Sequence, residues 1–153
     1  MSAFLFDSSA TVKRYAIETG SKWVFDILRP SAGNSIFVAG ITGAEVVAAL
    51  ARKRKAKRLT SAQATKAISR FQRHFSLRYQ KITITDSLVT AAMNYADKYE
   101  LGGYDAVQLA AAIEIENELK AVGASLVFVS ADEDLNEVAR AEGLLVENPD
   151  NYP

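Results

Sequence analysis

The stretch Phe4-Leu5-Phe6-Asp7-Ser8-Ser9 lies close to the start of the chain and gives the clearest indication of its fold. Three apolar residues that run into an acid and two hydroxyl residues are typical of a buried strand that delivers a carboxylate to the carboxyl edge of a parallel sheet. Open α/β sheets bind their ligands at that edge. The pattern returns where Leu126-Val127-Phe128-Val129 runs into Ser130-Ala131-Asp132. We therefore expect two strands to end in acids at one edge of a sheet.

Helical and extended patterns alternate along the chain between these strands. Ser8 or Ser9 is expected to cap a first helix that runs to about Ile17. Further strands are predicted over 34–39, 79–85 and 144–146, and further helices over 22–28, from 42 into the fifties, 60–74, 86–99, 106–122 and 132–141. Strands separated by helices, without hairpin signals, favour a parallel sheet covered on both faces. We predict an α/β fold with a parallel sheet of about four or five strands and a peripheral tail from Asn148 onward.

The composition is that of an ordinary globular protein, with 153 residues of which 49% are hydrophobic. This length fits a single domain over residues 1–153. The chain has 18 basic and 18 acidic residues, so its net charge does not predict a polyanionic partner. It has no cysteine, which excludes disulfides, thiolate nucleophiles and zinc–sulfur sites. No leader-like segment or run of about 18 apolar residues is present, and we expect a soluble, cytoplasmic protein without a membrane span.

Four acids are the candidates for chemistry, namely Asp7, Glu45, Asp105 and Asp132. Taken singly, each has an ordinary explanation as a helix cap or first-turn acid, and Thr42 and Glu45 have the spacing of a capping box. Taken together, they are expected to meet in one cleft, because strand ends and the following helix N-termini share an edge. Carboxylates that converge repel one another, and a hard divalent cation such as Mg²⁺ or Mn²⁺ relieves the repulsion. Such an ion can activate water for attack on a phosphodiester.

The order and spacing of four motifs resemble the PIN-domain nucleases, specifically the VapC toxins of bacterial and archaeal toxin–antitoxin pairs. These motifs are Phe-Leu-Phe-Asp7-Ser-Ser9, Thr42-x-x-Glu45, Tyr104-Asp105-Ala-Val-Gln-Leu-Ala, and Ser130-Ala-Asp132-x-x-Leu135 followed by Ala139 and Gly143. The resemblance covers essentially the whole chain. It implies a three-layer α/β/α fold and an Mg²⁺- or Mn²⁺-dependent endoribonuclease. It also implies a small antitoxin that neutralises the enzyme, and a homodimer.

The resemblance also assigns roles by position. The acidic quartet of catalytic and metal-binding residues falls on Asp7, Glu45, Asp105 and Asp132. Ser9 and Ser130 match hydroxyl positions that support the quartet, and Asp134 stands close enough to Asp132 to share or replace its role.

The sequence departs from the family pattern in two places. Gly102-Gly103 stands where a basic or larger residue is often found, and Gln108 stands where His is common. These departures concern substrate preference more than the metal site.

The run Arg52-Lys53-Arg54-Lys55-Ala56-Lys57-Arg58 concentrates six cations at the end of a predicted helix. One interpretation is a solvated helix end, whose cations complement the C-terminal dipole. The other is a contact with the phosphate backbone that recruits RNA without reading its sequence. The sequence leaves both interpretations open.

Two alternatives to a nuclease remain at this stage. The first is a catalytically inactive PIN-fold module that binds RNA or protein and uses the acids only as caps. The second is a phosphatase with Asp7 as the nucleophile, which is disfavoured because Ser9 stands where that chemistry needs a general acid. His74 is the only histidine, so a two-histidine ribonuclease mechanism is excluded, and we expect His74 on the solvent-exposed surface.

Overall fold

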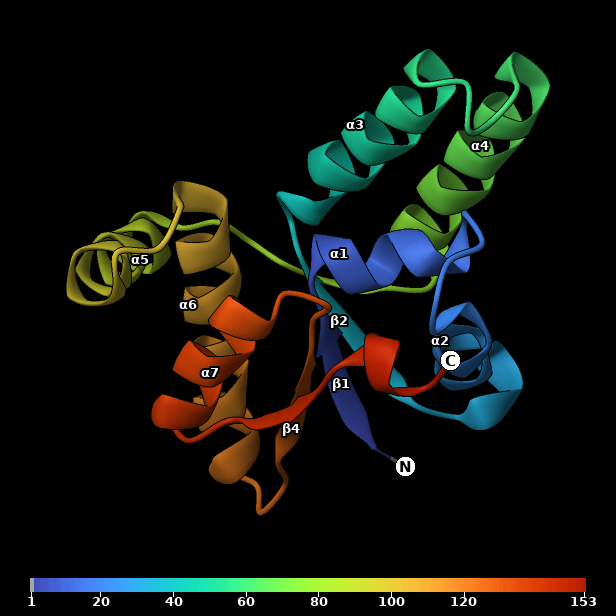
Figure 1. Ribbon diagram of the computed structural model, residues 1–153. Helices are drawn as coiled ribbons and strands as arrows, with labels where there is room; N and C mark the ends of the chain where they lie inside the picture. The colour runs from blue at the N-terminus through green and yellow to red at the C-terminus, as the bar shows by residue number, and fades with distance from the viewer. Residues whose placement is uncertain (1) are drawn as a thin grey trace.

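The computed structural model describes residues 2–153, which form three layers (Figure 1). Within these residues, five parallel strands make one sheet in the order β3-β2-β1-β4-β5. The predicted α/β fold with a parallel central sheet is thus confirmed. The strands are β1 (Ala3–Phe6), β2 (Ser35–Ala39), β3 (Gln80–Ile82), β4 (Leu126–Val129) and β5 (Leu145–Glu147).

Helices cover both faces of the sheet (Figure 1). One face carries α5 (Asp86–Tyr99), α6 (Gly103–Lys120) and α7 (Glu133–Ala141). On the other side lie α1 (Ser8–Thr11), α2 (Ser21–Leu28), α3 (Thr42–Lys55) and α4 (Ser61–Leu77). Short 3-10 helices are η1 (Val12–Arg14), η2 (Pro30–Ala32) and η3 (Pro149–Asn151). None of the helices in the described chain has the length and apolar character that crossing a membrane requires.

The two central strands divide their side chains between two apolar cores. Leu5 and Phe128 pack into the core under α5, α6 and α7, whereas Phe6 and Val129 pack into the core under α1 to α4. This period of two is what a parallel strand buried on both faces produces. Because Phe6 is in register with Val129, β1 and β4 end side by side. The backbone N–H of Asp7 extends the pairing by donating to the Val129 carbonyl at 3.0 Å.

The first helix differs from the prediction. Neither Ser8 nor Ser9 caps it, since Asp7 is the N-cap and its carboxylate accepts a hydrogen bond from the Ala10 N–H. Both serine hydroxyls are engaged elsewhere, with donor bonds to Glu45 and Asp7 respectively. The regular α-helix lasts one turn and continues as η1, so it does not reach Ile17.

The boundaries of β3 and α6 also shift. Strand β3 is shorter than predicted, and Tyr79, which precedes it, packs into the core instead. Helix α5 keeps the predicted bounds, and the side chain of Thr85 caps it by accepting a hydrogen bond from the Leu88 N–H. Helix α6 begins at Gly103 rather than at residue 106, because Gly102 is its N-cap and Gly103 its first residue.

The expectation that His74 is exposed is wrong, since only 3% of its surface is accessible. Its Nδ1 lies 2.8 Å from the hydroxyl of Tyr15, which also bonds to the hydroxyl of Tyr79. Burial and, secondarily, the positive charge of Arg78 lower the pKa of His74 to about 4. His74 is therefore a neutral core residue at physiological pH.

The expectation of a peripheral tail is also wrong. Asp150 forms an ion pair with the buried Lys13 at 2.8 Å, and the ring of Tyr152 stacks on Trp23 with centroids 4.7 Å apart. Asn148 and Pro149 are buried. The tail therefore closes over η1 and α2 (Figure 1).

Gly20 permits this closure, and its replacement is the first test of the fold. Its φ is +85°, and a Cβ at this position would lie 2.3 Å from the Pro149 carbonyl oxygen. We expect Gly20→Ala to lower the free energy of unfolding by roughly 3 kcal/mol or more, from left-handed strain plus a clash with backbone. Urea unfolding measures this loss.

Gly33→Ala is the matched control. Gly33 has φ +70°, and a Cβ added there would meet no atom within 4 Å, so only the conformational cost of roughly 1–2 kcal/mol applies. Equal losses in the two variants would show that the tail is not held by this close approach.

Candidate active site

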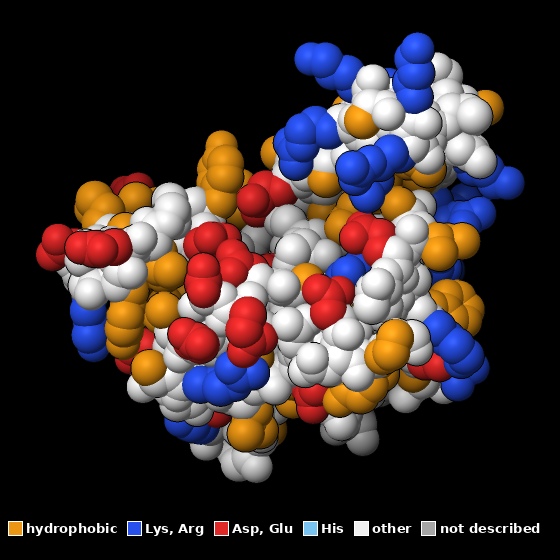
Figure 2. Space-filling view, viewed as in Figure 1, with side chains coloured by type: hydrophobic (Ala, Val, Ile, Leu, Met, Phe, Trp, Pro, Cys, Tyr) orange, Lys and Arg blue, Asp and Glu red, His pale blue; other side chains and the backbone are white. Residues whose placement is uncertain are grey.

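The four candidate acids lie on four different elements at the carboxyl edge of the sheet. Asp7 follows β1 directly, and Asp132 follows β4 as the N-cap of α7. Glu45 and Asp105 lie in the first turns of α3 and α6. Figure 2 shows acidic side chains gathered around a hollow in this face of the molecule. The sequence-predicted acids are thus brought to one edge from positions far apart in the chain.

Asp7 is the most deeply buried of the four, with 4% of its surface exposed. Its Oδ1 accepts hydrogen bonds from Ala10 N at 2.9 Å and from Ser9 Oγ at 2.7 Å. Burial raises its pKa to about 6, although the hydroxyls of Ser130 and Ser9 and the Ala10 N–H stabilise the charged form. The nearby charge of Asp105 raises it further. Asp7 is therefore a helix cap and a destabilised buried carboxylate at once.

Glu45 is not part of a capping box. The N-cap of α3 is Ile41, without a side-chain cap bond, so the capping-box explanation fails, although Glu45 does lie in the first turn. Its Oε1 instead accepts hydrogen bonds from Ser8 Oγ at 2.6 Å and from Gln108 Nε2 at 3.0 Å. The same Gln108 amide donates to Thr42 Oγ1 at 2.9 Å. Helices α1 and α6 thus fix the orientation of a carboxylate on α3.

Asp105 has no hydrogen-bond partner within residues 2–153, although it is half-buried. Burial raises its pKa, followed by repulsion from Asp132 and from Glu45. A carboxylate that is partly desolvated, without donors and close to two others, favours a cation beside it.

Asp132 and Asp134 differ in their surroundings. Asp132 Oδ1 accepts a hydrogen bond from Leu135 N at 3.2 Å, so its ordinary role as a cap is real. Asp134 is exposed in the first turn of α7 and has no hydrogen bond to the described part of the chain. Of these two acids, only Asp132 contributes to the repulsion that raises the pKa of Asp105.

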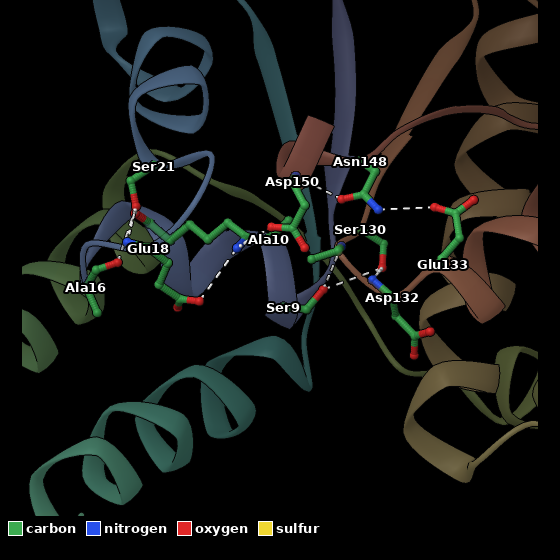
Figure 3. Close-up of polar contacts among 12 residues, drawn as sticks. Ser9, Ala10, Ala16, Glu18, Ser21, Ser130, Asp132, Glu133, Asn148 and Asp150 are labelled. Atoms are coloured by element: carbon green, nitrogen blue, oxygen red, sulfur yellow. Dashed lines mark hydrogen bonds and ion pairs between the residues drawn. The ribbon is translucent and has the colours of Figure 1, made fainter. Parts of the chain in front are cut away.

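Two serines link the ends of β1 and β4 (Figure 3). Ser9 Oγ donates to Asp7, accepts from Ala131 N at 3.0 Å, and lies 3.4 Å from Ser130 Oγ. Ser130 Oγ accepts from the backbone N–H of Asp132 at 3.0 Å. The two hydroxyls hold the loops that carry two of the acids in fixed positions.

The donor set fits a hard divalent cation. All four side chains offer carboxylate oxygen, which Mg²⁺ and Mn²⁺ prefer. Glu45 and Asp132 each use one oxygen in hydrogen bonds, whereas Asp105 uses neither. Across residues 2–153, no three acidic or histidine side chains stand close enough to form a ready-made metal cluster. Free carboxylate oxygens such as those of Asp105 suit Mg²⁺ that is bound through one or two carboxylates with water in the remaining positions, as is usual for this ion.

The cations of the basic run lie in the last turn of α3 and the turn after it. Arg52, Lys53 and Arg58 line a hollow that Ser9 and Ala131 also line. The other three, Arg54, Lys55 and Lys57, lie outside that hollow. The run is therefore divided by the fold into an inner and an outer half.

Sequence reasoning missed three residues of this region. Ser8 and Gln108 hold Glu45 across α1 and α6, and Lys13 is buried beside the site. The sequence singles out Gln108 only as a departure from the family pattern, and its position three residues after Asp105 places it on the same helix face. No local pattern identifies Ser8 or Lys13.

Comparisons with known proteins agree with this architecture. A family model described as PIN domain matches residues 4–141. The crystal structure of VapBC2 from Rickettsia felis, bound to a DNA fragment from its promoter, has a similar chain with TM-score 0.61 and 16% identity, covering 95% of this chain and 98% of that one. FitAcB from Neisseria gonorrhoeae is similar with TM-score 0.59 and 14% identity, covering 95% and 97%. No curated protein sequence matches this chain.

The burial of Asp7 predicts a pH-dependent stability of the metal-free protein. The pKa of Asp7 rises on folding from its ordinary value of 3.8 to about 6. Between these values the folded state binds more protons than the unfolded state, so stability falls as the pH rises through this window. Asp7→Asn stays neutral and keeps a carbonyl acceptor for the Ala10 N–H. In EDTA, the free energy of unfolding of Asp7→Asn should exceed that of the parent protein by up to about 3 kcal/mol above pH 7 and should equal it near pH 3.5. Urea unfolding measures this difference.

Asp134→Asn removes an exposed acid from the same region and serves as the control. Its stability should follow that of the parent protein at every pH. A gain in Asp7→Asn that is the same at pH 3.5 and pH 8 would contradict the predicted burial of a charged group.

Proposed function

The chain belongs to the PIN domain family, and on this premise we propose that it is an Mg²⁺- or Mn²⁺-dependent endoribonuclease, the VapC-type toxin of a toxin–antitoxin pair. One observation carries the proposal more than any other. Asp105 is half-buried, lacks any donor in the described chain, and is repelled by Asp132 and Glu45. A partly desolvated carboxylate without a donor, beside two others, is an arrangement that a bound cation would stabilise. We further propose that residues 1–153 act as one nuclease domain.

The catalytic and metal-holding set in this proposal is Asp7, Glu45, Asp105 and Asp132. A divalent cation bound there would acidify a water and stabilise charge on the leaving oxygen of a phosphodiester. The chain's own contribution is orientation. Ser8 and Gln108 fix Oε1 of Glu45, so that Oε2 is left for the cleft.

Supporting serines hold Asp7 and Asp132, the two acids that follow strands. Ser9 and Ser130 keep Asp7 ionised and in place, because donors to a buried carboxylate offset part of its desolvation. We assign the fourth acidic position to Asp132 rather than Asp134, since Asp132 is the one that acts on Asp105.

RNA is the proposed substrate, and the basic run Arg52–Arg58 is its proposed docking surface. Figure 2 shows cationic side chains gathered beyond the acidic hollow, toward the α3 end of the molecule. Backbone phosphates that bind there would lead the chain toward the acids. The phosphatase alternative is not favoured, because Oδ1 of Asp7 is occupied as a helix cap and the side chain is buried.

The proposed protein partners are a small antitoxin and a second copy of this chain. A VapBC pair among the similar folds supports the first. The second is supported by an apolar hollow of about 460 Å³ between α5 and α6, beside the exposed Val89, Met93 and Tyr104. Contiguous exposed apolar surface of this kind marks interaction sites.

Cleavage of single-stranded RNA tests the nuclease assignment. We expect activity that requires Mg²⁺ or Mn²⁺ and is abolished by EDTA. Asp7→Asn and Asp105→Asn should each lower it by more than about 100-fold, because charge stabilisation worth several kcal/mol is lost. Glu118→Gln, which neutralises an exposed acid on the same helix as Asp105, should retain the parent's activity.

Thermal unfolding with and without Mg²⁺ separates the enzyme from an inactive module. A carboxylate site that binds the ion in the folded state raises the melting temperature, and caps alone do not.

Undiminished cleavage by purified Asp7→Asn would overturn the nuclease assignment. Absence of both cleavage and Mg²⁺ stabilisation would favour the binding module.

The antitoxin is expected to compete with the metal. An arginine of the antitoxin can pair with two carboxylate oxygens at once and cannot lose its proton. Saturating Mg²⁺ should therefore weaken antitoxin binding measurably at constant ionic strength, and bound antitoxin should lower Mg²⁺ affinity by the same factor. Calorimetric titration at low and high Mg²⁺ measures this. Identical affinities would mean that inhibition acts elsewhere, by covering the RNA path or by blocking the dimer.

A further inference from the structure

The hollow lined by Arg52, Lys53 and Arg58 has a volume of about 550 Å³ and adjoins the acidic site. It lies between η1, the last turns of α3 and the tail, and its lining includes Ser9 and Ala131. Ser9 also donates to Asp7, so one side chain borders both the hollow and the acidic cluster. A polymer that lies across the acids is therefore able to continue into this hollow without leaving the surface.

The charge of this hollow is opposite to that of the acidic site. Its charged lining consists of four cations and two carboxylates, namely Lys13, Arg52, Lys53, Arg58, Glu18 and Asp150. Two positive charges are in excess at neutral pH. A cationic hollow beside a carboxylate cluster is complementary to a chain that carries regularly spaced negative charges.

The two lysines are already paired within the protein. Lys13 is 5% exposed, and its Nζ lies 2.8 Å from Asp150 and 3.5 Å from Glu18. Glu18 also lies 3.5 Å from the Nζ of Lys53. These four charges form a chain of alternating sign that is neutral as a whole and builds the floor of the hollow.

The excess charge resides on Arg52 and Arg58. Neither has an ion-pair partner within residues 2–153, and both are exposed. The turn after α3 brings Arg58 back toward the helix, where its N–H donates to the Lys53 carbonyl at 2.9 Å. Two guanidinium groups from different turns thus line one side of a built hollow. The planar fork of Arg matches two oxygens of a phosphate.

We propose that this hollow is a phosphate subsite, in which Arg52 and Arg58 bind the backbone phosphate of the RNA nucleotide adjacent to the one held at the carboxylates. The proposal rests on the proposed function for its ligand class. It narrows the docking surface to the inner half of the basic run. Lys13 acts as a positioning residue, because its pairing with Glu18 and Asp150 fixes the floor over which the phosphate lies.

The outer half of the run provides a matched control. Arg54 and Lys55 come from the same helix end and carry the same total charge as Arg52 and Arg58, yet they do not line the hollow. A diffuse electrostatic attraction would depend on both pairs alike. A built subsite depends on the inner pair alone.

The experiment measures binding without cleavage. Fluorescence anisotropy follows a labelled single-stranded RNA oligonucleotide with the parent protein, Arg52→Gln/Arg58→Gln and Arg54→Gln/Lys55→Gln, in EDTA over a salt series. The inner double variant should raise Kd about tenfold at low salt, since charge-assisted hydrogen bonds are lost. Its log–log salt slope should fall by about 0.7, the value for one phosphate contact on a single strand. The outer variant should raise Kd clearly less than the inner one, because its side chains do not line the hollow, and circular dichroism confirms that both variants are folded.

The outcomes separate this inference from the nuclease assignment. Equal weakening by both double variants, or no weakening by the inner one, would overturn the subsite even if RNA is cleaved. Selective weakening by the inner variant upholds the subsite even if no cleavage is found. Competition by inorganic phosphate at an affinity equal to that of the oligonucleotide would show an isolated anion site rather than part of an RNA path, and would overturn the assignment to RNA.

Discussion

The burial of the Asp7 carboxylate at the end of β1 is the constraint on which the site depends. The same side chain closes the first turn of α1 through the Ala10 N–H and lies within electrostatic reach of Asp105. Donors from Ser9 and Ser130 offset only part of its desolvation, so its pKa remains raised. A residue needed only as a cap would be more stable at the surface. The fold therefore maintains a destabilised carboxylate at the edge where α/β proteins bind ligands.

Contacts between distant elements hold the remaining acids in place. Gln108 of α6 and Ser8 of α1 meet at Glu45 of α3, so three elements define the position of one carboxylate. Gln108 is fully buried and also bonds to Thr42, which fixes the amide itself. Such a network keeps its geometry because each member packs against the rigid sheet layers. Asp105 is the exception, and its lack of donors leaves its charge available.

The sequence was most informative where the signal is local. An apolar run that ends in an acid identified β1 and β4, and the position of the acids at one edge follows from parallel topology. Distant partners account for most of the errors. His74 is buried because Tyr15 and Tyr79 bond to it from elsewhere in the chain, and the tail is held by Lys13 and Trp23. The capping box at Glu45 has the right spacing, but tertiary hydrogen bonds override it.

Although its net charge is zero, this molecule has an acidic region and a basic region side by side. Carboxylates crowd one part of the cleft, and guanidinium groups without partners in the described chain line the hollow next to it. Left in contact, these groups would neutralise one another. The paired charges of Asp150, Lys13 and Glu18 line the same hollow as the arginines, and the buried Lys13 can keep its charge there because two carboxylates hold it. Because Glu18 and Asp150 already pair with lysines, they leave the two arginines free for an anion.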